Sequence, residues 1–154
     1  LLNTGESSFV DVSTQSGEYF SIKRVGRGAA FGDYDNDGDT DIFVVNLNQE
    51  GVLLRNEGGN RNNWLMIKAV GVKSNRDGIG ARIKVVTGSN SQIREVQTGS
   101  SYLSGHDLRL LFGLGTETRV AQIEIPWPSR LKQTLEDVEA NQLLVVTEAV
   151  DAQK

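Results

Sequence analysis

The spacing of apolar residues constrains this chain more than any other feature of its sequence. Apolar side chains recur at every second position over 81–85, 108–112 and 121–125. A period of two places the apolar side chains on one face of a β-strand, and the longer period of an amphipathic helix is nearly absent. Two shorter, mostly apolar runs, 64–70 and 143–147, suit more deeply buried strands. The chain is therefore predicted to be all-β.

Turn signals separate these segments. The 154 residues include 17 glycines but only two prolines, whereas glycine makes up about 7% of an average protein. Glycine-containing turn signals lie at 76–78, 87–90, 98–100 and 113–115. About seven strands between Asn63 and Glu148 result, which is typical of an antiparallel β-sandwich. This sandwich domain is predicted to span residues 61–154.

The first sixty residues have a different organisation. Leu1–Gly5 resembles Leu53–Gly58 at an offset of about 52 residues, which is near the period of a propeller blade. A single repeat of this kind cannot bury its own faces. We therefore expect residues 1–60 to be a fragment of a β-propeller-type repeat that packs on the sandwich. The whole is expected to be part of a longer multi-repeat chain.

The segment 33–41 holds five aspartates in the pattern D-x-D-x-D-G-x-x-D. Calcium takes about six to eight oxygen ligands at about 2.3–2.6 Å, and carboxylates at alternate positions can turn toward one centre. Gly38 provides the sharp bend, because glycine adopts positive φ at little cost. Beyond the bend, a main-chain carbonyl and a last carboxylate close the shell. The predicted ligands of a Ca²⁺ ion are Asp33, Asp35, Asp37, Asp39 through its carbonyl, and Asp41.

This loop differs from an EF-hand. An EF-hand places a bidentate glutamate at its twelfth position, where this chain has Val44. Short apolar segments at 29–32 and 42–45 are predicted to enter and leave the loop as the strands of a hairpin. An acidic, solvated turn is the alternative, since Asp, Asn and Gly are common in turns. Five carboxylates this close repel one another strongly without a cation, which favours the metal site.

Charge and composition argue against several other functions. The chain carries −4 and the acidic loop −5, which leaves the remainder at +1, without the basic stripe that nucleic-acid binding requires. No apolar run approaches the about 18 residues of a membrane span. Without cysteine, and with His106 as the single histidine, neither a zinc site nor a histidine-based dyad can be assembled. We expect a protein that is not an enzyme.

Two aromatic residues are candidates for contact with a ligand or partner. Trp127 stands between two prolines, and burial at the end of a strand is the favoured interpretation because large aromatic side chains are mostly buried. If exposed, Trp127 and Tyr102 would offer faces that stack on sugars or on a partner protein. A carbohydrate-binding module that uses exposed aromatics on the sandwich is therefore the alternative function.

Two parts of the chain resemble known families. The first resembles an FG-GAP or VCBS repeat and consists of residues 26–33 with Phe31-Gly32, the acidic loop and the 42–44 segment. It lies closer to the VCBS form, because the Gly-Ala-Pro of the FG-GAP motif is absent. The remainder resembles an ASPIC/UnbV domain. Arg130 departs from it, since the family usually has glycine there. The motifs that carry this second resemblance are Asn63–Leu65, Ser74–Ala81, Arg94–Val96, Ser101–Ser104, Phe112–Gly115 and Trp127–Ser129.

The first resemblance implies a blade of an integrin-type β-propeller with calcium in its loop. The two together imply an extracellular, periplasmic or cell-surface protein, as among bacterial exported proteins and the cartilage acidic protein family. They imply no established catalytic activity for the ASPIC/UnbV part. The expected function is binding or adhesion, to a protein or a glycan, with a calcium ion whose role is mainly structural.

Overall fold

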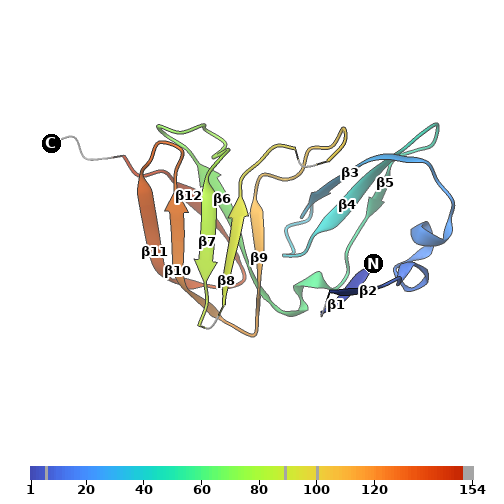
Figure 1. The fold of residues 1–154 in the computed structure, drawn as a ribbon, viewed down its shortest axis with the longest axis horizontal. Coiled ribbons are helices and arrows are strands. Elements are labelled where there is room, and N and C mark those ends of the chain that lie inside the picture. The colour runs from blue at the N-terminus through green and yellow to red at the C-terminus, as the bar shows by residue number, and fades with distance from the viewer. Residues whose placement is uncertain (6, 89, 100, 151–154) are drawn as a thin grey trace.

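The computed structural model describes residues 1–150 except 6, 89 and 100. Within them the strands form four sheets, and the helices are short 3-10 turns at Ser13–Gln15, Glu18–Ser21 and Gly59–Arg61. The all-β prediction is confirmed. None of the described helices is long and apolar enough to cross a membrane. Figure 1 shows two parts side by side, a larger group of strands toward the C-terminus and a smaller sheet toward the N-terminus.

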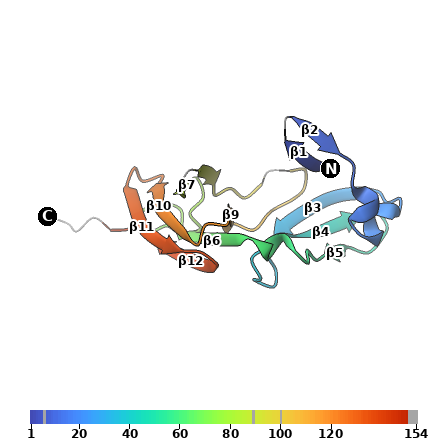
Figure 2. The ribbon, with the colours of Figure 1, turned by 90° about the horizontal axis from the view of Figure 1, so that it is seen from below.

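The larger part is a sandwich of two sheets. One has the strand order β11-β10-β7-β8 and the other the order β12-β6-β9, and Figure 2 shows them as two layers. The sandwich and its number of strands agree with the prediction. The seven strands are β6 Asn63–Val70, β7 Arg82–Val86, β8 Ser91–Glu95, β9 Leu110–Gly115, β10 Arg119–Pro126, β11 Lys132–Glu139 and β12 Gln142–Thr147.

One strand pair departs from the antiparallel arrangement. β12 runs parallel to β6, with Gln142 opposite Leu65. The chain crosses from one sheet to the other between β11 and β12, and Asn141 fixes the crossing point. The Asn141 N–H donates to the Trp64 carbonyl at 2.6 Å, and the Asn141 Oδ1 accepts from the Trp64 N–H at 3.1 Å. β12 thereby begins beside the start of β6 and follows it in the same direction.

The hydrophobic core lies between the two sheets of the sandwich. The alternation predicted for 81–85 is confirmed, because Ala81, Ile83 and Val85 are buried while Arg82 is exposed. Each large apolar side chain that is fully buried stabilises the fold by about 1.5–3 kcal/mol. All members of this core cluster lie between Leu65 and Val146. The largest contributors from the rest of the sandwich are Leu65, Ile67, Phe112, Val120, Ile123, Ile125 and Trp127.

The smaller part contains the hairpin predicted around the acidic loop. β3 pairs with β4 and β4 with β5, all antiparallel, in the order β3-β4-β5. We call this the hairpin sheet. A second, two-stranded hairpin precedes it. The bounds are β1 Leu2–Gly5, β2 Ser8–Val10, β3 Gly26–Gly32, β4 Asp41–Asn46 and β5 Val52–Leu54.

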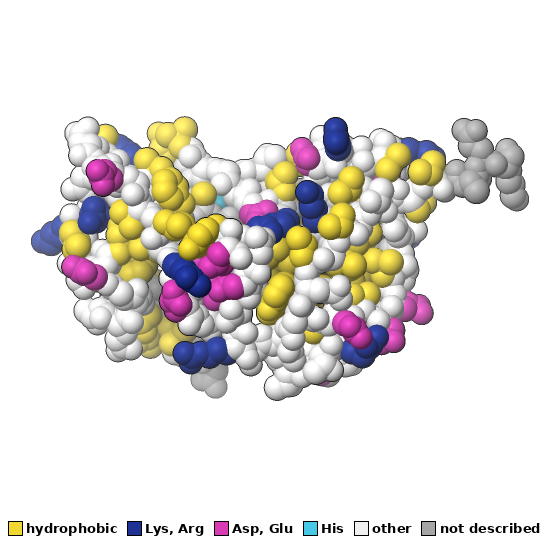
Figure 3. All heavy atoms as spheres, turned by 180° about the vertical axis from the view of Figure 1, so that it is seen from behind, with side chains coloured by type: hydrophobic (Ala, Val, Ile, Leu, Met, Phe, Trp, Pro, Cys, Tyr) yellow, Lys and Arg dark blue, Asp and Glu magenta, His cyan; other side chains and the backbone are white. Residues whose placement is uncertain are grey.

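The hairpin sheet rests on the sandwich without sharing its core. Phe31 and Phe43 remain more than two-fifths exposed, and Figure 3 shows hydrophobic side chains spread over this part of the molecule. No described residue before Leu65 belongs to the core cluster. Hydrogen bonds make the connection instead: the Asp107 N–H donates to the Phe31 carbonyl at 2.9 Å. The expectation that residues 1–60 contact the sandwich is therefore met, by contacts that lie outside the core cluster.

Candidate metal centre

The hairpin geometry determines the shape of the acidic loop. Gly32 at the end of β3 pairs with Asp41 at the start of β4, so the intervening residues must reverse the chain within one tight loop. Two of them adopt positive φ: Asn36 at 61° and Gly38 at 95°. Asparagine tolerates this left-handed region better than most residues, and glycine adopts it freely. The bend predicted at Gly38 is confirmed.

Three carboxylates converge in this loop. One oxygen atom from each of Asp33, Asp35 and Asp37 lies within 4.8 Å of the other two. Asp33 is buried and orders the turn, because its two oxygens accept from the N–H groups of Asp37 at 3.1 Å and Gly38 at 2.9 Å. Acidic side chains gather near the middle of the face shown in Figure 3. These three predicted ligands are thus brought together by local structure.

The other two predicted ligands have buried side chains that accept backbone hydrogen bonds. The Asp41 carboxylate accepts from Tyr34 N–H at 3.2 Å and Asn56 N–H at 2.8 Å. The Asp39 Oδ2 accepts from Gly59 N–H at 3.1 Å. The Asp39 side chain is thus held toward Gly59 through Oδ2, whereas the ligand predicted at this position is the main-chain carbonyl. The assignment of Asp39 and Asp41 to a metal shell stays a prediction.

Electrostatic repulsion within the loop is visible at Asp39. Burial, followed by the charges of Asp37 and Asp41, raises the pKa of the Asp39 carboxyl. Its Oδ1 atom is buried and has no hydrogen-bond partner among the described residues. Arg55 provides partial compensation on the other side, with its Nε 3.0 Å from Asp35 Oδ2.

The donor set fits a hard divalent cation. It consists of carboxylate oxygens from alternate positions of one loop, and Ca²⁺ prefers oxygen ligands in flexible geometry. A cation beside Asp37 would also reduce the repulsion that burdens Asp39. No nitrogen or sulfur donor belongs to the described cluster, so the chemistry differs from that of a zinc site.

Arg109 of the sandwich contacts this loop directly, and sequence reasoning did not single it out. Its Nη2 donates to the Asp33 carbonyl at 2.6 Å and its Nη1 to the Asn36 Oδ1 at 2.5 Å. The Nε donates to Asp107 Oδ2 at 2.7 Å, which holds the guanidinium in place. The hydrogen bond to Asp107, with the charges of Asp107 and Asp33, raises the pKa of Arg109 against the opposing effect of burial. Arg109 is 73 positions from Asn36 and 76 from Asp33, so no local pattern could have indicated the contact.

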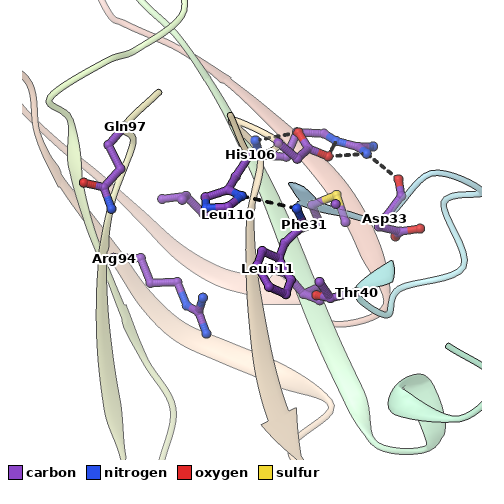
Figure 4. Close-up of a pocket in the computed structure, with 12 residues that line it drawn as sticks. Phe31, Asp33, Thr40, Arg94, Gln97, His106, Leu110 and Leu111 are labelled. Atoms are coloured by element: carbon purple, nitrogen blue, oxygen red, sulfur yellow. Dashed lines mark hydrogen bonds and ion pairs between the residues drawn. The ribbon is translucent and has the colours of Figure 1, made fainter. Parts of the chain in front are cut away.

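The single histidine lies at the same junction. His106 Nδ1 accepts from the Phe31 N–H at 3.2 Å, and the two rings meet edge to face with centroids 5.1 Å apart. Figure 4 shows both residues beside a cavity of about 250 Å³ that also borders Asp33, Thr40 and Arg94. The imidazole therefore serves as a hydrogen-bond acceptor for the edge strand of the hairpin sheet.

The two candidate aromatic contacts differ in exposure. Trp127 is only 3% exposed, and its Nε1 donates to Gln133 Oε1 at 3.0 Å. The burial favoured for Trp127 is confirmed, so this side chain offers no face to a sugar or a partner. Tyr102 is 71% exposed. The turn after Trp127 places Arg130 at φ 74°, in the left-handed region where the resembling family usually has glycine.

A second site missed by sequence reasoning is the buried Glu148 carboxylate just after β12. Its Oε2 accepts from the N–H groups of Val72, Lys73 and Ser74 at 2.7, 2.8 and 2.7 Å, and its Oε1 from the hydroxyls of Ser74 and Ser129. Burial opposes the charged form, but the hydrogen bonds outweigh it and lower the pKa of Glu148 to about 2. This carboxylate fixes the loop after β6 to the end of β12.

These features define a class of protein: an all-β chain in which a hairpin with a carboxylate-lined loop precedes a two-sheet sandwich. Residues 71–153 match the family described as ASPIC and UnbV. Because the match covers more than half of the chain, the chain belongs to this family. The match includes β7 to β12 and leaves out the hairpin sheet, the acidic loop and β6. No curated protein matches the chain.

Proposed function

We propose that this protein is a non-enzymatic, calcium-binding module for binding or adhesion. The observation that carries the proposal is the convergence of Asp33, Asp35 and Asp37 on one loop of the hairpin sheet. These three carboxylates would hold the ion, with the Asp39 carbonyl and Asp41 as further donors. The ion supplies positive charge that neutralises the loop and fixes its shape, so its role is structural.

The resemblance of residues 26–44 to an FG-GAP or VCBS repeat supports the same assignment. Repeats of that kind carry calcium in a loop with this spacing of aspartates, and the strands β3 and β4 flank the loop here as a hairpin. An extracellular, periplasmic or cell-surface location follows as part of the proposal. Calcium is abundant outside cells, so even a site with Kd of about 10⁻⁴–10⁻³ M would be occupied there.

The positions and hydrogen-bond partners of the titratable groups favour a binding role over catalysis. The carboxylates of the loop belong to one contiguous segment, and the His106 acceptor nitrogen is engaged by the Phe31 N–H. Glycoside hydrolysis by two carboxyls would need them to face each other across a cleft. The proposed partner is a protein or a glycan. Tyr102 and its neighbour Leu103 are both more than two-thirds exposed, which favours the region 101–104 for such a contact.

Isothermal titration calorimetry of metal-stripped protein with Ca²⁺ and with Mg²⁺ tests the proposal. We expect one saturable site that prefers calcium, because Mg²⁺ demands stricter octahedral geometry and gives up water reluctantly. Asp35→Ala should weaken binding severely, whereas Asp77→Ala, in an exposed turn outside the loop, serves as the matched control. Absence of binding heat together with an unchanged melting curve in calcium would refute the assignment.

The carbohydrate-binding alternative now depends on Tyr102, because Trp127 is buried. A glycan array that compares the intact protein with Tyr102→Ala distinguishes the two functions. Specific glycan signals that disappear in the variant would favour a carbohydrate-binding module.

A further inference from the structure

We propose that the acidic loop is also the joint between the hairpin sheet and the sandwich, and that Arg109 and Trp64 of the sandwich are positioning residues for its metal. Calcium binding and docking of the two parts would then be thermodynamically coupled. This inference rests on the proposed calcium site. It adds that the sandwich, through these two residues, controls the affinity of the loop for calcium.

Arg109 is the first contact that supports this coupling. Its guanidinium spans two points of the loop, the Asp33 carbonyl and the Asn36 side chain, while Asp107 holds it from the sandwich side. The dashed line to Asp33 in Figure 4 marks the first of these bonds. Asp33 is one of the three converging carboxylates, and Asn36 is at the left-handed position of the turn. Arg109 therefore holds the part of the loop whose backbone shape sets the direction of the carboxylates.

Trp64 makes the second contact, on the other flank of the loop. A Cβ atom added to Gly38 would lie 2.0 Å from the Trp64 ring, which means that the loop backbone packs directly against the indole. Trp64 stands at the start of β6, in the sandwich. In the segment before β6, the Asn60 side-chain amide donates to the Asp37 carbonyl at 3.0 Å. The loop is thus held between two residues of the sandwich that are 45 positions apart.

Away from the loop, the junction is thinly packed. The core cluster has no described member before Leu65, and a cavity of about 250 Å³ lies between Phe31 of β3 and Leu110 of β9, as Figure 4 shows. Among the described residues, the other connections to β3 are the hydrogen bonds Asp107 N–H to the Phe31 carbonyl, Phe31 N–H to His106 and Ala29 N–H to Ser104 Oγ, together with the edge-to-face contact of the Phe31 and His106 rings. Because apolar burial contributes little here, the contacts of the acidic loop carry much of the docking.

The coupling follows from reciprocity. A contact that holds the loop in its binding shape lowers the ordering cost of metal binding, and the metal strengthens that contact by the same factor. Loss of a bidentate, charge-assisted hydrogen-bond pair is expected to weaken calcium binding about tenfold or more. Arg109 is itself a cation, so on Coulomb grounds its removal would favour a second cation nearby. The two effects have opposite signs, so a net weakening of calcium binding can be attributed only to the lost positioning contacts.

Calorimetric titration of the full chain with Ca²⁺ is the test, with Arg109→Met as the variant. Arg119→Met is the matched control, because Arg119 also bridges two acceptors but does so on the exposed edge of β10 and β11, with Asp137 and Glu139. We expect Arg109→Met to weaken binding about tenfold or more and Arg119→Met to leave it unchanged. Unchanged or tighter binding by Arg109→Met, with wild-type affinity intact, overturns the inference.

Three further measurements keep the result interpretable if Arg109→Met folds poorly. Asn36→Gly removes one acceptor while retaining a residue suited to positive φ, and a double-mutant cycle with Arg109→Met isolates their interaction. Trp64 fluorescence should change with calcium in the wild type and not in Trp64→Phe, where Trp127 remains as reference. Hydrogen exchange at Asp107 N–H should slow with calcium. Calcium binding that leaves both signals unchanged contradicts the coupling; wild-type protein that binds no calcium refutes the proposed function itself.

Discussion

Replacement of Glu148 by glutamine removes a negative charge from the sandwich and preserves the shape of the side chain. The carboxylate is 1% exposed and accepts five hydrogen bonds, three from consecutive backbone N–H groups and two from serine hydroxyls. Glutamine can offer one acceptor oxygen but turns an NH₂ donor toward the remaining donors. The loop at 72–74 then loses the charged acceptor that orders it.

The magnitude follows from the pKa of Glu148. The folded-state pKa of about 2 lies below the unfolded reference of 4.5, and each pKa unit corresponds to about 1.4 kcal/mol. The ionised form therefore stabilises the fold by about 3 kcal/mol at neutral pH. Since the folded pKa is depressed, this stability is present above pH 4.5 and is lost as the pH falls toward 2. Five bonds to a charged acceptor, each weakened by about 0.5–1 kcal/mol on neutralisation, give the same order.

Urea denaturation of wild type and Glu148→Gln at a series of pH values measures this contribution. We expect a difference of about 3 kcal/mol in the free energy of unfolding at pH 7 that shrinks between pH 4.5 and pH 2. Glu136→Gln, on the exposed side of β11, is the matched control and should change stability by less than about 0.5 kcal/mol. A difference that stays constant with pH, or that is below about 1 kcal/mol at pH 7, would refute the reasoning.

Three other predictions concern the loop and the turns. Excess chelator should lower the melting temperature of calcium-loaded protein, because a ligand that binds only the folded state stabilises it by mass action; identical scanning-calorimetry traces would contradict this. Gly38→Ala should destabilise the protein by about 2–4 kcal/mol, since φ is 95° and the new Cβ meets the Trp64 ring. A urea midpoint equal to that of wild type would contradict this close packing of the loop on Trp64. Arg130→Gly should be neutral or stabilising by up to about 1 kcal/mol, because glycine removes the strain of a side chain at positive φ. A clear loss of stability in thermal melting would count against strain at this position.

The local features of the fold could be predicted from the sequence. Alternation at 81–85 identified which side chains of β7 face the core, and the aspartate spacing identified both the loop and the two strands that enclose it. These inferences succeeded because the period of a strand and the bend at a glycine depend on neighbouring residues alone.

The contacts that join distant segments could not be predicted in the same way. Arg109 reaches Asn36 across 73 positions, and Glu148 reaches Ser74 across 74. Each side chain also has an ordinary local explanation, Arg109 as the polar member of an alternating strand and Glu148 as a residue at a strand end. Only the packing of the two sheets brings these pairs together. The parallel pairing of β12 with β6 has the same origin, because periodicity identifies a strand but not its direction.

The placement of β12 beside β6 has a consequence for how the chain folds during synthesis. β6 is the middle strand of its sheet, and its two neighbours come from residues 110–115 and 142–147. Both pairings have large sequence separation, and folding slows as such non-local contacts dominate. The apolar residues Leu65, Met66 and Ile67 of β6 must therefore wait unpaired while about 45 further residues, through β9, emerge from the ribosome at about 5–20 residues per second, and the second neighbour β12 follows only about 30 residues later. For several seconds this central strand depends on chaperones, or on its own Lys68 and the asparagines at its start, to avoid aggregation.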